Sequence, residues 1–398
     1  MSQTNKGIEN TEQRKRYPVD PNRHHRENGW DYKGRAIYHF TLPVEECYPL
    51  FGTLEGDSAE AAHIWLNPFG YQVYRILCDL PQFYGEKGFA LKMLVFRIMP
   101  DHIHLVIQVL EPLPKSIGVV VRGFKAACTK LYKQEYFPGS SVHFSGVFAA
   151  GDPWDSTVRI EKPTEVPMQF ARIFAGRGSI WQQDPAYYHE RILHAPGQLR
   201  RMIDYVKDNP RRLWLKTHNP DLFKIHRRTE VYGMLFTSMG NHFLLDWPDR
   251  QLVEMSRNAT EEQMQERLRS VLAAAYNGAV TYTAAISKGE QYIARTVREQ
   301  GYPMVVLLND GFPKEGSPKE RFFKPGGTYF EACSKGQLLL LEPTEQTFVA
   351  PTIHVATEET LRLKAEVKHF DYAKLPADSQ RYRFVALNEI GRLLVMGE

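Results

Sequence analysis

The chain has 398 residues, of which 43% are hydrophobic and 24% charged, and its formal net charge is +4. These values are ordinary for folded domains, which excludes fibrous and disordered classes and predicts two or three domains. No apolar run approaches the roughly 18 residues that a membrane helix needs, and four scattered cysteines exclude a disulfide scaffold. The first residues lack the apolar core of a secretory signal, so we expect a cytoplasmic protein with no membrane partner.

Positive charge is concentrated in one segment. Residues 1–230 hold 31 basic and 25 acidic side chains, whereas residues 231–398 hold 19 and 21. Within the first part, residues 196–228 alone carry nine basic and three acidic residues. Such a cluster predicts a surface that binds phosphate groups. The alternative is a solvated helix face with no ligand.

The first elements are predicted from composition and periodicity. Residues 1–29 are polar and basic and indicate a flexible arm. The aromatic, β-prone residues 37–42 predict a strand. Apolar positions at helical spacing in residues 67–84 predict a helix that begins at Pro68, because proline suits the first turn.

A hairpin and a basic helix follow. Residues 91–98 and 102–110 are two β-prone runs separated by only three residues, which indicates a hairpin. Residues 116–136 predict a helix, and the Gly/Pro-rich residues 137–179 predict a long insertion or lid. Residues 199–209 predict a short helix that ends or kinks before the proline at position 210.

The second half of the chain alternates between strands and helices. Thr260 and Gln263 fit a capping box at the start of a helix. Beyond it, β-prone and helical segments alternate, which predicts a parallel α/β sheet. The strands are expected at 279–283, 304–308 and 338–342, and the helices at 289–299, near 329, at 357–370 and at 382–394.

Two histidines give the clearest chemical signal. In the predicted strand at 102–109, alternate side chains point to opposite faces, so His102 and His104 share one face. Two imidazoles side by side on a rigid strand suit two ligands of one metal ion. The alternative is a pair of partly buried structural histidines.

The basic helix carries a second candidate pair, Tyr205 and Asn209, which lie four residues apart and therefore on one helix face. A tyrosine hydroxyl becomes a nucleophile once its ionised form is favoured. The amide oxygen of Asn209 is a neutral, hard ligand that would complete a His/His/Asn metal site. On its own this spacing is also that of an ordinary helix surface.

Three motifs together resemble a known family. MPDHIHLVI (99–107), SIWQQDPAYYHERIL (179–193) and YVKDNP (205–210) are similar to REP-associated and insertion-sequence-type single-tyrosine transposases, which are HUH endonucleases. WDYKGRAIYHFTLP and the helix with RGFKAACTKLY (122–132) fall in the expected order. The resemblance covers roughly residues 30–216.

The resemblance implies a ferredoxin-like α+β nuclease domain over residues 30–228. His102, His104 and Asn209 would bind Mg²⁺ or Mn²⁺, and Tyr205 would attack single-stranded, hairpin-forming DNA. This attack would give a 5′-phosphotyrosine intermediate and a free 3′-OH for strand transfer. The metal would polarise the scissile phosphate and offset its developing charge.

Several residues are candidates for DNA contacts. Basic side chains near Tyr205 and on the helix at 116–136 would hold phosphates, and aromatic residues of the second motif would stack on unpaired bases. For each aromatic, a place in the core is the alternative. The candidates are Arg122, Lys125, Arg200, Arg201, Lys207, Arg211, Arg212, Trp181, Tyr187 and Tyr188.

Within residues 229–398, the segments TAAISKGEQYIARTVREQGYPMVVLLNDGF (283–312), KPGG (324–327) and CSKGQLLLLEP (333–343) resemble, more weakly, the Rossmann-like fold of DNA-processing protein A. Ser287, Lys288 and Gly289 follow a predicted strand and open a helix, which makes them a candidate anion cradle. No G-x-G-x-x-G or P-loop motif is present. The alternative is a scaffold whose loops bind nothing.

The leading interpretation is thus a metal-dependent DNA nickase and strand transferase, a transposase associated with the nucleoid. One alternative is a catalytically silent hairpin-binding protein that derives from a transposase. Another is a hydrolase that uses water, with zinc on His102 and His104. Family members differ in whether they form homodimers, and the sequence leaves that question open.

Overall fold

The computed structural model describes residues 27, 29–135, 178–182, 189–317, 320, 323, 325–349 and 380–397. Nearly all of the expected arm at 1–29 lies outside these residues. So do most of the expected insertion at 137–179, the helix expected at 357–370, and Tyr187 and Tyr188. No helix in the described part of the chain is long and apolar enough to cross a membrane.

The chain divides into two compact units, of which the first ends at Trp214 and the second begins at Leu215. The sequence placed this boundary after residue 228. That position would cut strand β7 (His226–Val231), which pairs with β8 (Met234–Gly240) inside the second unit. The boundary therefore lies earlier in the chain than expected.

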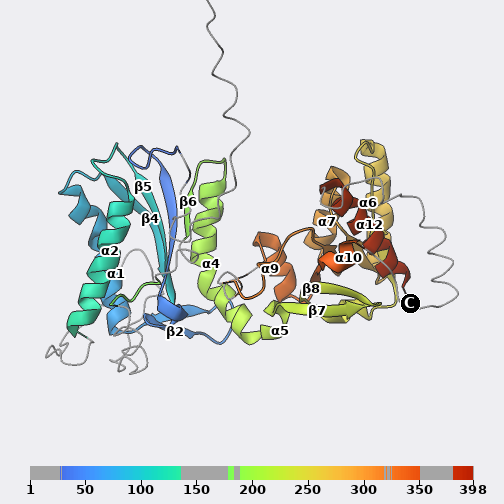
Figure 1. Ribbon diagram of the computed structural model, residues 1–398, viewed down its shortest axis with the longest axis horizontal. Helices are drawn as coiled ribbons and strands as arrows, with labels where there is room; N and C mark the ends of the chain where they lie inside the picture. Colours follow the sequence, from blue (N-terminus) through green and yellow to red (C-terminus); the bar gives the residue numbers. More distant parts are fainter. Residues whose placement is uncertain are drawn as a thin grey trace, which may run out of the picture. The chain divides into compact units, whose positions relative to one another are not determined.

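The first unit is built on an antiparallel sheet of four strands in the order β4-β5-β1-β6. Helix α1 connects β1 to β4, and helix α2 follows β5 (Figure 1). The resulting β-α-β-β-α-β order is that of a ferredoxin-like domain. The elements are β1 (Ile37–Pro43), α1 (Pro68–Gly85), β4 (Leu91–Ile98), β5 (His102–Val109), α2 (Gly118–Glu135) and β6 (His189–Ile192).

The predicted hairpin and the start of the first helix are confirmed. Strands β4 and β5 pair directly, and Ile98 lies opposite Ile103 next to the turn. Helix α1 begins at Pro68, and the side chain of Asn67 caps it by accepting the backbone N–H of Gly70 at 2.8 Å. A small hairpin of β2 (Gly52–Glu55) and β3 (His63–Leu66), with a short 3₁₀ helix before it (Glu45–Cys47), was not predicted.

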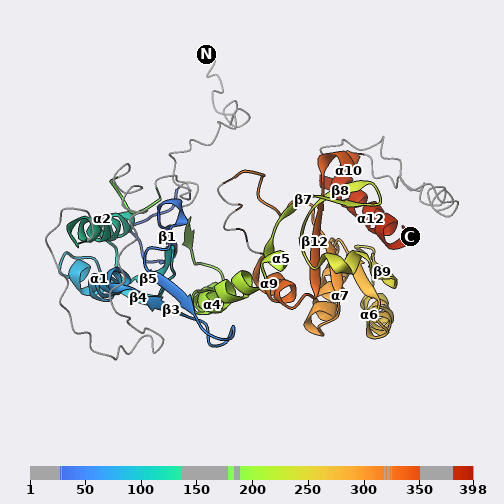
Figure 2. The ribbon, with the colours of Figure 1, turned by 90° about the horizontal axis from the view of Figure 1, so that it is seen from below.

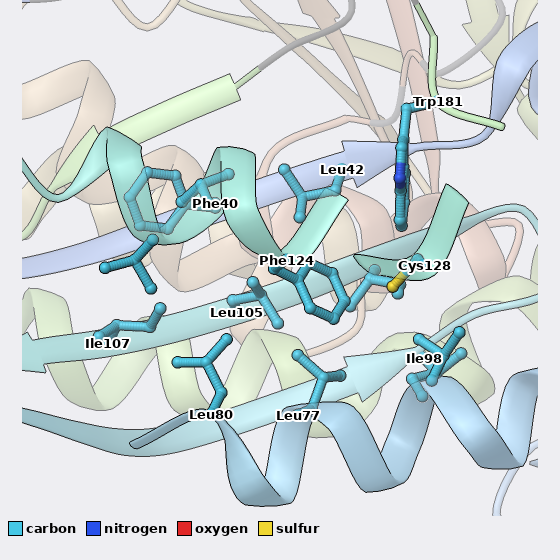
Figure 3. Packing of buried hydrophobic residues seen from close by; sticks show 14 of the residues in the cluster. Phe40, Leu42, Leu77, Leu80, Ile98, Leu105, Ile107, Phe124, Cys128 and Trp181 are labelled. Carbon is cyan, nitrogen blue, oxygen red and sulfur yellow. The ribbon is translucent and has the colours of Figure 1, made fainter. Parts of the chain in front are cut away.

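One face of this sheet and the two helices α1 and α2 enclose the main core. Alternate residues of β1 and β5, such as Phe40 and Leu105, point into it, where Leu77 of α1 and Phe124 of α2 meet them (Figure 3). All of them are almost inaccessible to solvent. The alternation that placed the apolar side of β5 toward a core is therefore confirmed, and the histidines occupy the opposite face.

Helix α4 (Gln198–His218) covers the opposite face of the same sheet (Figure 1). Its Val206 packs against Val106 of β5 and Leu193. The helix was expected to end or kink before Pro210, and it does not end there, because it continues to His218. An internal proline costs a helix about 3 kcal/mol, but Val206, Asn209 and Pro210 are buried on the sheet-facing side, and this packing offsets the local cost.

The second unit has a mixed sheet of six strands in the order β7-β8-β12-β11-β10-β9. The last four strands of this order are parallel; three of them, β12, β11 and β10, were predicted, and β9 was not. The prediction missed that β7 and β8 form an antiparallel hairpin, which joins the sheet against β12. The remaining strands are β9 (Arg250–Val253), β10 (Val280–Thr283), β11 (Met304–Leu307) and β12 (Leu338–Pro343).

Helices cover both faces of this second sheet (Figure 2). Leu268 of α6, Ile293 of α7 and Phe330 of α9 share one apolar cluster with the sheet, and α12 covers the other face with Leu387 and Ile390. The capping box that Thr260 and Gln263 predicted is present on α6. The helices are α5 (Pro220–Phe223), η3 (His242–Leu245), α6 (Glu261–Tyr276), α7 (Lys288–Glu299), α9 (Gly327–Ser334), α10 (Glu345–Val349) and α12 (Gln380–Met396).

Candidate active site

Strand β5 places His102 and His104 in the centre of the first unit. It lies between β4 and β1, so its backbone is hydrogen-bonded on both sides. The His104 side chain is 3% exposed, on the sheet face that helix α4 covers. The two rings meet at right angles, with centroids 4.8 Å apart. A central strand of this kind holds both imidazoles rigidly.

Each imidazole is held through its far nitrogen. Nδ1 of His102 lies 2.6 Å from Oδ1 of Asp101. Nδ1 of His104 lies 3.1 Å from Oγ1 of Thr41 and 3.1 Å from Nε2 of His39. The remaining nitrogens, Nε2 of His102 and Nε2 of His104, face each other at 3.2 Å. Three groups, two from β1 and one from the β4–β5 turn, therefore direct two nitrogens toward one point.

This arrangement fits a divalent ion. The Asp101 carboxylate favours a proton on Nδ1 of His102, which leaves a lone pair on Nε2 of that ring. A metal-bound histidine characteristically donates its other N–H to a carboxylate or another oxygen in this way. Two nitrogens about 2.1 Å from one ion, at right angles, stand about 3 Å apart. The observed separation of 3.2 Å between the two Nε2 atoms is close to that value.

The side-chain oxygen of Asn209 is a buried hydrogen-bond acceptor without a donor. The residue is fully buried, and its Nδ2 donates to the backbone carbonyl of Tyr205 at 2.8 Å. Its Oδ1 is buried without a hydrogen-bond partner, which is rare for a buried polar atom and calls for an explanation such as an ion. Among the described residues, no three His, Cys, Asp or Glu side chains are grouped to hold a metal. The predicted ligand set differs from such a cluster in taking its third ligand from an amide oxygen.

Tyr205 lies directly against the histidine pair. Its ring meets the His104 ring edge to face, with centroids 5.5 Å apart, and the Arg212 guanidinium carbon lies 5.5 Å from the Tyr205 ring centroid. Burial raises the pKa of the Tyr205 hydroxyl above its usual value, although Arg212, Asn209 and Arg191 act in the opposite direction. The phenol is consequently protonated at neutral pH, and its attack on a phosphate requires the loss of that proton.

The basic residues of helix α4 fall into two groups. Arg212 is 6% exposed and lies beside Tyr205. By contrast, Arg211 holds Asp208 through Nε at 2.6 Å, and Arg200 lies 3.9 Å from Asp204 on the exposed surface. The side chains of Arg201 and Lys207 are also exposed. Of the two neighbouring arginines, only Arg212 is thus placed beside the candidate nucleophile.

Three predicted DNA-binding residues lie on the wrong side of the sheet. Arg122 and Lys125 belong to α2, which packs on the face opposite α4. Lys125 is partly buried, and desolvation lowers its pKa while Glu45 opposes this effect. Trp181 is 1% exposed, and its Nε1 donates to the carbonyl of Lys125 at 2.8 Å. Its indole is part of the core, so it has no free face for a nucleobase (Figure 3).

The groups near the histidines that were not predicted are His39, Thr41, Asp101 and Arg191. A signal for two of them was present, because His39 and Thr41 alternate with the apolar residues of IYHFTLP as His102 and His104 do in β5. Strand pairing then places Thr41 opposite His104 and Arg191 opposite His39. This register is a tertiary property, and no local pattern gives it.

The candidate anion cradle at Ser287, Lys288 and Gly289 is occupied by the chain itself. Oε2 of Glu290 accepts the backbone N–H groups of Ile286 at 2.6 Å and Ser287 at 3.1 Å. The Ser287 hydroxyl caps the helix by accepting the N–H of Glu290. Gly289 is needed for packing, because a Cβ there would collide with Met255. We therefore do not propose an anion site at this position.

Glu290 should be important for the stability of the second unit. It is 1% exposed, and its other oxygen accepts the N–H of Met255 at 2.9 Å. We expect Glu290→Ala to lower the free energy of unfolding by about 3 kcal/mol or more, because several buried donors lose their acceptor. Scanning calorimetry should show an earlier transition. Glu299→Ala, at an exposed position of the same helix, should unfold as the wild type does, and equal stability of the two variants would contradict this role.

Two solved structures are similar to part of the chain. A REP-associated tyrosine transposase bound to a REP hairpin is 13% identical, with a TM-score of 0.25, and the match covers 46% of this chain and 72% of that one. A putative transposase from Deinococcus radiodurans R1 is 14% identical, with a TM-score of 0.23, and the match covers 46% and 96%. No family model and no curated protein matches the chain.

Proposed function

We propose that the protein is a metal-dependent endonuclease and strand transferase for single-stranded DNA, a transposase whose nucleophile is Tyr205. The observation that carries this proposal is the meeting of two elements. The paired Nε2 atoms of His102 and His104, 3.2 Å apart, lie beside a tyrosine whose ring centroid is 5.5 Å from that of His104. Metal ligands and a nucleophile in contact are what phosphoryl transfer through a covalent intermediate requires.

His102, His104 and the unpaired Oδ1 of Asn209 would hold Mg²⁺ or Mn²⁺. Once bound, the ion would polarise the scissile phosphate and offset the charge that develops on it. The protein itself positions the partners. Asn209 is four residues after Tyr205 on the same helix, so the helix that supplies the nucleophile also supplies a ligand. Its Nδ2 is bonded to the Tyr205 carbonyl, which fixes the amide and directs Oδ1 away from the helix backbone.

The proposed reaction begins at the Tyr205 hydroxyl oxygen. Its Oη would form a bond to the phosphorus while the bond to the 3′ oxygen breaks. The phenolic proton ends on that leaving oxygen, directly or through water. The products are a 5′-phosphotyrosine and a free 3′-OH, so the phosphodiester energy is kept for rejoining. The Arg212 guanidinium, buried beside the Tyr205 ring, would neutralise part of the phosphate charge.

The strand would lie along the exposed side of helix α4. Arg200, Arg201 and Lys207 project to solvent there and would contact backbone phosphates, which position a strand without reading its sequence. We propose hairpin-forming DNA as the substrate, in keeping with the motifs that resemble single-tyrosine transposases. An unpaired segment beside the hairpin would enter the site, because a duplex would not bring its backbone to a nucleophile that lies, partly buried, between helix α4 and the sheet.

Covalent capture tests the proposal. A pool of hairpin-forming single strands labelled at the 3′ end is incubated with the full-length protein and Mn²⁺, and the products are resolved on a denaturing gel. We expect the label to move with the protein, since Tyr205 would retain the 5′ phosphate of the downstream fragment. Chelation of the metal by EDTA should prevent this shift. Intact binding without any adduct would favour the silent hairpin-binding alternative, and nicking without an adduct would favour a hydrolase.

A further inference from the structure

Two polar side chains of strand β1 lie behind His104 on the side away from His102. Nε2 of His39 and Oγ1 of Thr41 each lie 3.1 Å from Nδ1 of His104. His39 is 6% exposed, and its ring stacks on that of His104, with centroids 5.2 Å apart and an interplanar angle of 22°. Both groups contact Nδ1 of His104, and a metal ion would bind the other nitrogen, Nε2.

The position of these groups is set by strand pairing. Thr41 lies directly opposite His104 in the antiparallel ladder of β1 and β5, and His39 lies opposite Val106. Their side chains emerge on the face of β1 that helix α4 covers, while Tyr38 and Phe40 point into the main core. A buried imidazole and a partly buried hydroxyl therefore lie on a face where an apolar pair would pack as well. Burial of polar groups is costly unless they are satisfied, so this placement needs a reason.

The tautomer of His104 supplies the reason. An imidazole binds a metal through one nitrogen only when that nitrogen carries no proton, and the proton must then be on the other nitrogen. With the proton on Nδ1, His104 would donate it to the Thr41 hydroxyl or to Nε2 of His39. Both acceptors are within hydrogen-bonding distance, and the stacked His39 ring also restricts rotation of the His104 ring.

We propose that His39 and Thr41 form a positioning pair that holds His104 in the tautomer and orientation needed to bind a divalent ion. This inference rests on the proposed function, because it concerns a ligand of the same ion. His102 has the equivalent support from the Asp101 carboxylate. The two ligands are thus held differently: His102 is held by a carboxylate, and His104 is held by a hydroxyl and a second imidazole.

Conservative substitutions separate this role from simple packing. Thr41→Val keeps the shape of the side chain and removes the hydroxyl, and His39→Phe keeps a stacked ring and removes its nitrogens. His39→Gln returns an amide oxygen close to the position of Nε2. A packing role predicts that valine and phenylalanine are tolerated and glutamine is not. The positioning role predicts the opposite order.

In the experiment, the full-length protein is titrated with Mn²⁺. Binding is measured by isothermal titration calorimetry and, independently, from the electron paramagnetic resonance signal of the free ion. Loss of a group that supports a metal ligand typically weakens binding 10–100-fold. We expect a loss of roughly that size for Thr41→Val and His39→Phe, a larger loss for the double variant, and near-wild-type affinity for His39→Gln. His63→Phe and Thr53→Val change the same residue types in the small hairpin of β2 and β3 and should leave the affinity unchanged.

The outcomes distinguish this inference from the proposed function. Wild-type protein that binds no Mn²⁺ would overturn both the metal site and the positioning pair. If the wild type binds Mn²⁺ through His104, and Thr41→Val and His39→Phe bind it with the same affinity, the positioning pair is wrong. The proposed function would then be unaffected. Near-ultraviolet circular dichroism identifies a variant that fails to fold. If Thr41→Val fails to fold, Thr41→Ser, which retains the hydroxyl, should restore both the spectrum and the affinity for Mn²⁺.

Discussion

Tyr205→Phe is expected to abolish the covalent DNA adduct and to lower strand cleavage by about 10³-fold or more, which is the usual scale when a nucleophile is removed. The substitution removes one oxygen and keeps the ring, so the contacts with His104 and Arg212 are retained. Binding of the same hairpin strands should therefore be unchanged. The measurement compares adduct formation with binding on the same labelled strands, by denaturing gel and by fluorescence anisotropy.

Tyr71→Phe is the matched control for this variant. Tyr71 lies on helix α1, on the other side of the sheet from Tyr205, and its replacement removes a phenolic oxygen without touching the site. It should cleave and form adducts as the wild type does. Full cleavage by Tyr205→Phe would show that another group attacks the phosphate, and the assignment of the nucleophile would then be wrong.

The sequence predicts those parts of the site that lie within one element. A period of two places His102 beside His104 on a strand, and a period of 3.6 places Tyr205 beside Asn209 on a helix. Both pairs are found where this reasoning expects them, on elements that pack against each other. Periodicity predicts which residues share one face of a strand or helix. Faces that are buried on folding pack against each other, which brings the two pairs together.

The support around the histidines could not be predicted in the same way. Thr41 and His104 are 63 residues apart in the chain, and their contact depends on the register of β1 against β5. A shift of one residue in this register would move every side chain of β1 to the other face. The pattern of β1 shows that its two polar residues share a face, but only the paired sheet shows which histidine they meet.

Local rules also failed where tertiary packing outweighs them. Pro210 predicts a helix end or a kink, yet the helix does not end there, because its sheet-facing residues are buried. Trp181 lies in a motif that suggested contact with DNA, but its indole fills the core and finds a hydrogen-bond acceptor on α2. At Ser287 the capping signal and the anion-cradle signal are the same residues, and the acidic residue three positions later decides between them.

His104→Ala should lower strand cleavage as much as Tyr205→Phe does, but by removing the metal ion and not the nucleophile. His104 is the central group of the site, since its ring contacts His102, His39 and Tyr205. We expect the variant to lose detectable Mn²⁺ binding and to cleave about 10³-fold more slowly, because a metal ion contributes several kcal/mol of charge stabilisation and each 1.36 kcal/mol is tenfold in rate. Calorimetry with Mn²⁺ and the labelled-strand assay measure the two losses separately.

The buried position of His104 requires a second variant in the same test. His102 is more accessible, with 14% of its side chain exposed, so His102→Ala should fold normally and show the same double loss of ion binding and cleavage. His63→Ala, a histidine of strand β3 outside the site, should lose neither. If both site variants still bound Mn²⁺ as the wild type does, the ion would lie elsewhere, and the facing nitrogens would be only a hydrogen-bonded pair. If ion binding were lost and cleavage persisted, Tyr205 would act without a metal, and Arg212 would become the principal source of charge stabilisation at the phosphate.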